Sequence, residues 1–99
     1  MTKKLDIVEK IIEEKKNKKL NFYKLILLND DFTTMDFVVK ILIMFLNKTN
    51  IQAQSLMLKV HNEGSAVCGI FPIDVAKTIQ KKIHNYSSIN HQPLKCIIK

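Results

Sequence analysis

Residues 23–39 read YKLILLNDDFTTMDFVV and join an apolar strand, an acidic turn and the beginning of an apolar helix. The run from Tyr23 to Leu28 has the length of one strand, and its nearly continuous apolar character predicts a central position in a sheet. Asn29, Asp30 and Asp31 follow, and such side chains favour turns because they hydrogen-bond their own backbone. Two adjacent carboxylates also repel each other. The turn is therefore a sound structural element and, equally, a candidate site for a cation or an ammonium group.

A helix is predicted over residues 34–46, directly after this turn. Thr33 is expected to cap it, with Asp36 three residues later returning a hydrogen bond to the backbone. Nearly every position of the helix is apolar except Asp36 and Lys40. A helix of this kind is buried on most of its circumference or presents an apolar wall to a ligand.

The remaining elements follow from hydrophobic period and from Gly and Pro positions. A capping box at residues 49–52 and a stop at Gly64 bound the second helix. Beyond it, Gly69 marks a place of close backbone approach. The predicted elements are a helix over 51–62, a strand over 65–71, a helix over 72–86, a polar loop over 87–92 and a strand over 94–98. This order, β-α-α-β-α-β, predicts an α+β domain: a three-stranded antiparallel sheet covered on one face by three helices.

The first 21 residues differ from the rest and are expected to be a flexible N-terminal extension, with one domain over residues 22–99. Leu5, Val8 and Ile12 recur at helical spacing, so residues 6–16 could form a short amphipathic helix. An isolated helix of that length is marginal in water, and the lysine-rich residues 15–19 indicate a solvated linker.

Composition excludes several classes of protein. With 46% hydrophobic and 25% charged residues, the chain is typical of a soluble globular protein. Its most apolar run, Ile41 to Leu46, is far shorter than the ~20 residues that a bilayer requires, so no membrane association is expected. Charged residues interrupt the N-terminal region, so no signal peptide is expected and the protein is placed in the cytoplasm.

The net charge of +7 raises nucleic-acid binding as a weak alternative. All sixteen basic residues are Lys, so the planar guanidinium that reads guanine is missing. The charge is also spread along the chain, and no Gly-rich phosphate loop exists among two glycines. We therefore expect no nucleic-acid partner.

Residues suited to catalysis or metal binding are sparse. A pair of Cys68 and His61 is conceivable, but no third orienting group is apparent. The histidines His61, His84 and His91 lack the spacing of a helical metal site. Cys68 and Cys96 are expected to be buried structural thiols. The sequence thus predicts no catalytic residue, no metal and no cofactor.

Three blocks of the chain resemble the ClpS family of adaptor proteins. Residues 23–38 are similar to that family's signature, close to Y-K-V-I-L-L-N-D-D-Y-T-P-M-E-F-V. LMLKVHNEGSAVCGIF (residues 56–71) resembles its second block, a helix ending in V-H-x-x-G followed by A-x-C-G. HQPLKC (residues 91–96) resembles its closing H-x-P-L-x-C. The blocks occur in the family's order and cover roughly residues 21–99.

The resemblance implies a monomeric, non-enzymatic adaptor. Such proteins bind the free α-amino group and large first side chain (Phe, Leu, Tyr or Trp) of N-degron substrates. They deliver these substrates to the N-terminal domain of a ClpA or ClpC type ATPase, a step for which the family's flexible extension is needed. The alternative from another class is a ribosome-associated structural domain, because the stalk protein's C-terminal domain shares this order of strands and helices.

The resemblance also assigns a site. An α-amino group is a cation with a pKa near 8, so it requires acceptors and negative charge. The residues implied for the α-amino group are Asn29, Asp30, Asp31 and His61. The residues implied for the hydrophobic pocket are Thr33, Met35, Val38, Met57, Val60 and Leu94.

One residue of this site, Met35, and its neighbour Thr34 lead to predictions. Met35 lies where the family has a gatekeeper against β-branched side chains, so Met35→Ala is expected to admit N-terminal Ile or Val. Thr34 replaces the family's usual proline, which is expected to loosen the turn slightly. Thr34→Pro is accordingly expected to stabilise the fold by a fraction of a kcal/mol.

Overall fold

The computed structural model describes residues 21–99, which form six elements in the predicted order. The elements are β1 (Phe22–Leu28), α2 (Met35–Leu46), α3 (Asn50–Glu63), β2 (Ser65–Pro72), α4 (Ile73–Ile89) and β3 (Lys95–Ile98). The strands form one antiparallel sheet of order β2-β1-β3, so β1 is central, and the predicted α+β class is confirmed. The amphipathic segment expected at residues 6–16 and its linker lie outside the described residues.

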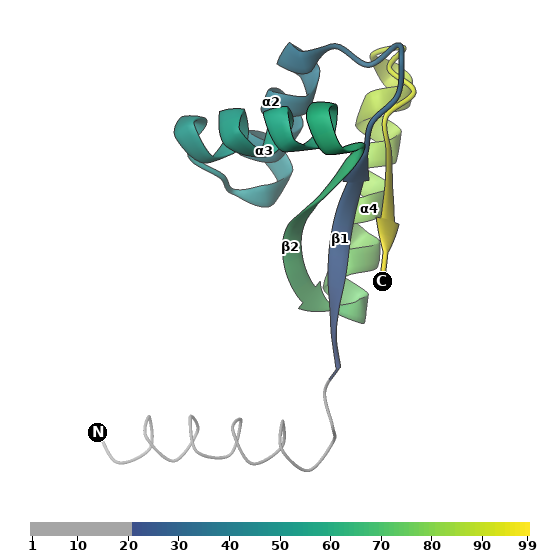
Figure 1. The fold of residues 1–99 in the computed structure, drawn as a ribbon. Helices are drawn as coiled ribbons and strands as arrows, with labels where there is room; N and C mark the ends of the chain where they lie inside the picture. Colours follow the sequence, from purple (N-terminus) through teal and green to yellow (C-terminus); the bar gives the residue numbers. More distant parts are fainter. Residues whose placement is uncertain (1–20) are drawn as a thin grey trace, which may run out of the picture.

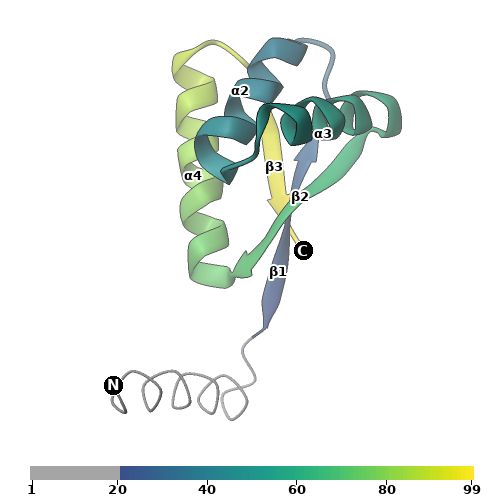
Figure 2. The same cartoon turned by 90° about the vertical axis from the view of Figure 1, so that its left-hand side faces the viewer.

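The three helices are arranged so that β1 ends beside α2 and α3 (Figures 1 and 2). α4 runs along one face of the sheet and packs against all three strands. α2 and α3 pack against each other across the end of the sheet to which β1 points. The acidic turn that follows β1 therefore enters the space beside these two helices.

The core is built on the inward-facing residues of β1. Leu25 and Leu27 are fully buried, and Leu27 pairs with Ala66 of β2 and Cys96 of β3. The register between β1 and β2 shifts between Leu25 and Ile26, which leaves Cys68 as a bulge. The bulge changes the alternation along β2, so that Phe71 packs against the core.

Gly69, next to this bulge, differs in detail from the expectation. The group that approaches it closely is the ring of Phe71, which a Cβ at position 69 would overlap. The prediction of close approach is correct, but the neighbour is a side chain and not a backbone.

α2 begins at Met35, one residue later than predicted, and its cap is likewise shifted by one residue. Its N-cap is Thr34, whose Oγ1 accepts a hydrogen bond from the backbone N–H of Phe37 at 3.2 Å. Thr33 was the wrong choice because its hydroxyl donates to Asp30 Oδ2 instead. The second helix follows its prediction closely: Thr49 and Gln52 form a capping box, and Gly64 ends the helix at φ 88°.

α4 extends to Ile89, further than the predicted end at Tyr86. The polar residues from Ser87 onward indicated a loop, but Ser87 is only 1% exposed and continues the buried stripe of Ala76 and Ile83. Tertiary burial at helical spacing thus prevails over the weak helix propensity of serine. Within residues 21–99, the structure has no helix whose length and apolarity suffice to span a membrane.

Candidate functional site

The acidic loop, residues 29–34, is organised by the side chain of Asp30. Its Oδ1 accepts hydrogen bonds from the backbone N–H groups of Phe32 (2.8 Å) and Thr33 (2.6 Å). Its Oδ2 accepts the Thr33 hydroxyl at 2.6 Å. This is the local bonding that makes Asp a turn residue, and it explains why the strand stops here.

The two ends of the acidic loop are fixed to other parts of the chain. The Asn29 N–H donates to the Gly64 carbonyl at 2.9 Å, which joins the end of β1 to the turn after α3. At the other end, the Thr34 N–H donates to Gln92 Oε1 at 3.1 Å. Gln92 lies in the connection between α4 and β3, which residues 90–94 form.

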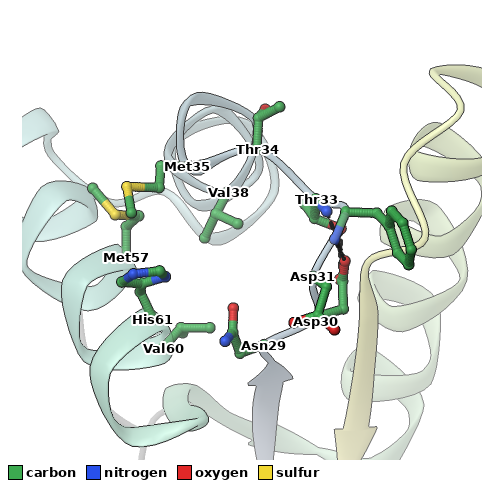
Figure 3. A pocket seen from close by; sticks show the side chains of 11 residues that line it. Asn29, Asp30, Asp31, Thr33, Thr34, Met35, Val38, Met57, Val60 and His61 are labelled. Carbon is green, nitrogen blue, oxygen red and sulfur yellow. Dashed lines mark hydrogen bonds between the residues drawn. The ribbon is translucent and has the colours of Figure 1, made fainter.

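A cavity of about 420 Å³ opens between the acidic loop, α2 and α3. Its volume lies within the ~300–1,000 Å³ typical of ligand pockets. The lining residues are Asn29, Asp30, Asp31, Phe32, Thr33, Thr34, Met35, Val38, Met57, Val60 and His61. In Figure 3, the Asn29 side chain points into the opening between the α3 residues on one side and the acidic loop on the other.

The cavity has a polar part and an apolar part. Val38, Met57 and Val60 form the apolar part and are 6%, 8% and 2% exposed, so these side chains are held firmly by the core. Met35 at the start of α2 is 43% exposed and stands at the edge of the opening. Such an arrangement accommodates a large apolar group beside a positively charged group that donates hydrogen bonds.

The structure brings together every predicted site residue except Leu94. Leu94 is 2% exposed and belongs to the core instead of the cavity lining. Phe32 and Thr34 line the cavity although the sequence did not single them out as site residues. Their position in the sequence could have identified them. Both follow or separate predicted site residues in one tight turn, and residues of a tight turn stay close together.

The electrostatics of the loop favour a negative charge. Burial by itself raises the pKa of the Asp30 carboxyl, but the hydrogen bonds from Thr33 and Phe32 outweigh it and hold that pKa below its usual value. Asp30 is therefore ionised at neutral pH. Oδ1 accepts two hydrogen bonds and Oδ2 one, which leaves one lone pair on Oδ2 for a ligand.

Reactive groups elsewhere in the described chain are poorly placed for chemistry. Burial raises the pKa of the Cys96 thiol to about 12 and also raises that of Cys68, so neither is a thiolate near neutral pH. Among residues 21–99, no group of three or more His, Cys, Asp and Glu side chains is arranged to hold a metal ion.

The fold and the cavity define a small α+β binding module whose site joins an anionic loop to an apolar wall. Residues 18–97 match the family model described as ATP-dependent Clp protease adaptor protein ClpS. The chain belongs to the ClpS family, a family of adaptors and not of proteases.

Individual relatives agree with this assignment. The ClpS adapter protein of Wolinella succinogenes is 48% identical over 77 residues, which cover 78% of this chain and 76% of the relative. That of Shewanella piezotolerans is 38% identical over 98 residues, covering 99% and 95%. The structure of Agrobacterium tumefaciens ClpS2 bound to L-phenylalaninamide superposes with a TM-score of 0.78 at 29% identity, covering 81% of this chain and 96% of that one.

Proposed function

We propose that this adaptor binds the free α-amino group and the large hydrophobic first side chain of N-degron substrates, namely Phe, Leu, Tyr or Trp. It delivers them to the N-terminal domain of a ClpA or ClpC type ATPase, as a monomer in the cytoplasm. The observation that carries the proposal is one cavity lined by the acidic loop on one side and by Val38, Met57 and Val60 on the other.

The polar part of the cavity suits an ammonium group. The Asn29 amide oxygen and the His61 ring offer acceptors, while Asp30 and Asp31 supply negative charge. Each charge-assisted hydrogen bond contributes ~1.5 to 3 kcal/mol. An acetylated amine has no charge and only one N–H, so it loses most of the binding free energy that these hydrogen bonds supply.

The apolar part suits the first side chain. Burial of a Phe or Leu side chain contributes ~2 to 3 kcal/mol. Together with two or three such hydrogen bonds this reaches about −8 kcal/mol, which is a Kd of about 1 μM. The L-phenylalaninamide bound by Agrobacterium tumefaciens ClpS2 has both groups, a free α-amine and an aromatic side chain, which supports the proposal.

Fluorescence anisotropy of a labelled peptide that begins with Phe tests the proposal. The free-amine peptide is expected to bind with a Kd of about 1 μM, and the same peptide acetylated at its α-amino group is expected not to bind. Asp31→Asn and His61→Ala are each expected to abolish binding. Asp74→Asn is the matched control for Asp31→Asn, because Asp74 is exposed on α4 and lies outside the cavity.

Equal binding of the acetylated and free peptides would refute α-amine recognition. Binding that survives both Asp31→Asn and His61→Ala would place the peptide elsewhere on the molecule.

We further propose that Met35 excludes peptides whose first side chain is β-branched. Its side chain stands at the edge of the cavity, so Met35→Ala widens the entrance. We expect the variant to bind peptides that begin with Ile or Val, measured by the same anisotropy assay. Unchanged rejection of these peptides would remove Met35 from the gate.

A further inference from the structure

Thr34 lies at the junction between the two parts of the cavity. Its hydroxyl caps α2 by accepting the Phe37 N–H, while its own N–H donates to Gln92 Oε1. Thr34 is the last residue of the acidic loop, and Met35 follows it. The position of Thr34 therefore sets the distance between the anionic loop and the apolar wall.

Gln92 is the residue that fixes this junction from outside the loop. It is separated from Thr34 by 58 positions in the chain. Its side chain lies outside the acidic loop and accepts a hydrogen bond from that loop. Within residues 21–99, no other side chain outside the loop is hydrogen-bonded to a loop residue. Gln92 does not line the cavity, so it acts on the site only through Thr34.

The backbone that carries Gln92 is itself well held. Its N–H donates to the Ser87 carbonyl at 2.8 Å, which attaches it to the last turn of α4. The next residue is Pro93, whose φ is restricted by its ring, and Leu94 is anchored in the core at 2% exposure. A side chain on such a segment offers its acceptor oxygen from a fixed point.

We propose that Gln92 is a positioning residue for the peptide site: its hydrogen bond to the Thr34 N–H holds the acidic loop in register with Met35 and Val38. This inference rests on the proposed function, because the distance matters only for a ligand that touches both parts. The connection between α4 and β3, residues 90–94, thereby contributes to the site through Gln92.

Gln92→Ala tests the role in two measurements. In the anisotropy assay, the Kd for the Phe peptide is expected to rise about threefold to tenfold, the range that a single hydrogen bond supplies. In the free protein, amide hydrogen exchange at Thr34 is expected to accelerate. The Asn29 amide, which donates to Gly64, is the internal reference and is expected to keep its exchange rate.

Two further variants isolate the hydrogen bond from other effects. Gln92→Glu keeps an acceptor oxygen, so the Thr34 amide is expected to stay protected. Thr34→Pro removes the N–H, so adding Gln92→Ala to it is expected to change the Kd no further. Gln54→Ala is the matched control, because Gln54 is exposed on α3 and does not line the cavity.

An unchanged Kd or unchanged Thr34 exchange in Gln92→Ala overturns the positioning role and leaves the proposed function standing. If the Kd of the double variant rises by the product of the two single-variant factors, the positioning role is overturned as well. If the wild-type chain binds no Phe peptide, the proposed function fails, and the role of Gln92 in peptide binding fails with it. The exchange experiment needs no peptide, so the two failures are distinguishable.

Discussion

At the scale of single residues, Thr34 has several roles that its sequence position alone conceals. A stabilising Thr34→Pro change is expected from the sequence because the family usually has proline here, and the Thr34 φ of −73° lies in the range that proline prefers. The structure adds two hydrogen bonds that proline cannot make, one through the hydroxyl and one through the N–H. These contacts reverse the expected sign.

Thr34→Pro is therefore predicted to destabilise the fold by about 1 kcal/mol. Loss of a capping side chain costs ~1 kcal/mol and loss of the second hydrogen bond ~0.5 to 1 kcal/mol, against a gain of ~0.4 to 1 kcal/mol from the stiffer unfolded chain. Urea unfolding monitored by circular dichroism measures the difference. A midpoint equal to or above that of the wild type would contradict this account.

Ser87 is a second residue whose role depends on its surroundings. Its hydroxyl is buried and has no hydrogen-bond partner among residues 21–99. A buried polar group without a partner is unfavourable, so Ser87→Ala is predicted to raise the free energy of unfolding by about 1 kcal/mol. The adjacent Ser88→Ala is the control, because Ser88 is exposed and a change within ~0.5 kcal/mol is expected there. A destabilised Ser87→Ala protein would show that the hydroxyl is satisfied in solution.

At the scale of secondary-structure elements, side chains of α4 form hydrogen bonds with backbone groups of the edge strand β3. The Cys96 N–H donates to His84 Nε2 at 3.0 Å, and Gln80 Nε2 donates to the Cys96 carbonyl at 2.8 Å. One turn of α4 thus occupies both backbone groups that Cys96 directs away from β1. These contacts protect the edge against pairing with another chain at this position.

The hydrogen bond between the Cys96 N–H and the His84 ring makes the stability of the fold depend on pH. Burial, followed by the nearby Lys95 cation, lowers the pKa of His84 below its ordinary 6.5, and the Cys96 N–H requires the lone pair of the neutral ring. The contribution of His84 is therefore complete above pH 6.5 and is lost as the pH falls through its lowered folded-state pKa. We predict that the free energy of unfolding decreases as the pH falls from 7 to below 6.5.

His84→Gln tests the assignment, because glutamine accepts the Cys96 N–H without titrating. Urea unfolding at several pH values is expected to show a flatter pH dependence for this variant than for the wild type. If both proteins lose the same stability over this range, His84 is not the responsible group.

At the scale of the whole molecule, the described domain presents a lined cavity held by its own core. Among residues 21–99, those that line the cavity lie between Asn29 and His61, and the core contacts that hold them come from residues 25–98. The N-terminal extension is implied by the family resemblance to serve delivery. Binding and delivery should therefore separate on truncation.

Removal of residues 1–20 is predicted to leave the Kd for the Phe peptide unchanged within about twofold, a difference of ~0.4 kcal/mol. The same truncation is predicted to stop degradation of a Phe-starting reporter by a reconstituted Clp protease. Anisotropy and reporter fluorescence measure the two steps separately. Weaker binding by the truncated chain would show that the extension takes part in the site, and undiminished degradation would remove it from delivery.

The sequence by itself determined the features that depend on short stretches of chain. The strand–turn–helix at residues 23–39, the capping box at Thr49 and the stop at Gly64 were all predictable, because their hydrogen bonds and apolar periods span a few residues. The same local patterns predicted the α+β class and, through the resemblance, most of the residues that line the cavity.

Tertiary structure decided the features that join distant residues. Gln92 holds the Thr34 N–H from 58 positions away, beside the local bond by which Asp30 engages the Thr33 hydroxyl and leaves Thr34 to cap α2. α4 continues through Ser87 because packing buries that face, and Leu94 lies in the core and not in the cavity lining. In each case the decisive contact depends on how α4 and its following connection pack against the sheet and the acidic loop, which no local pattern in the sequence encodes.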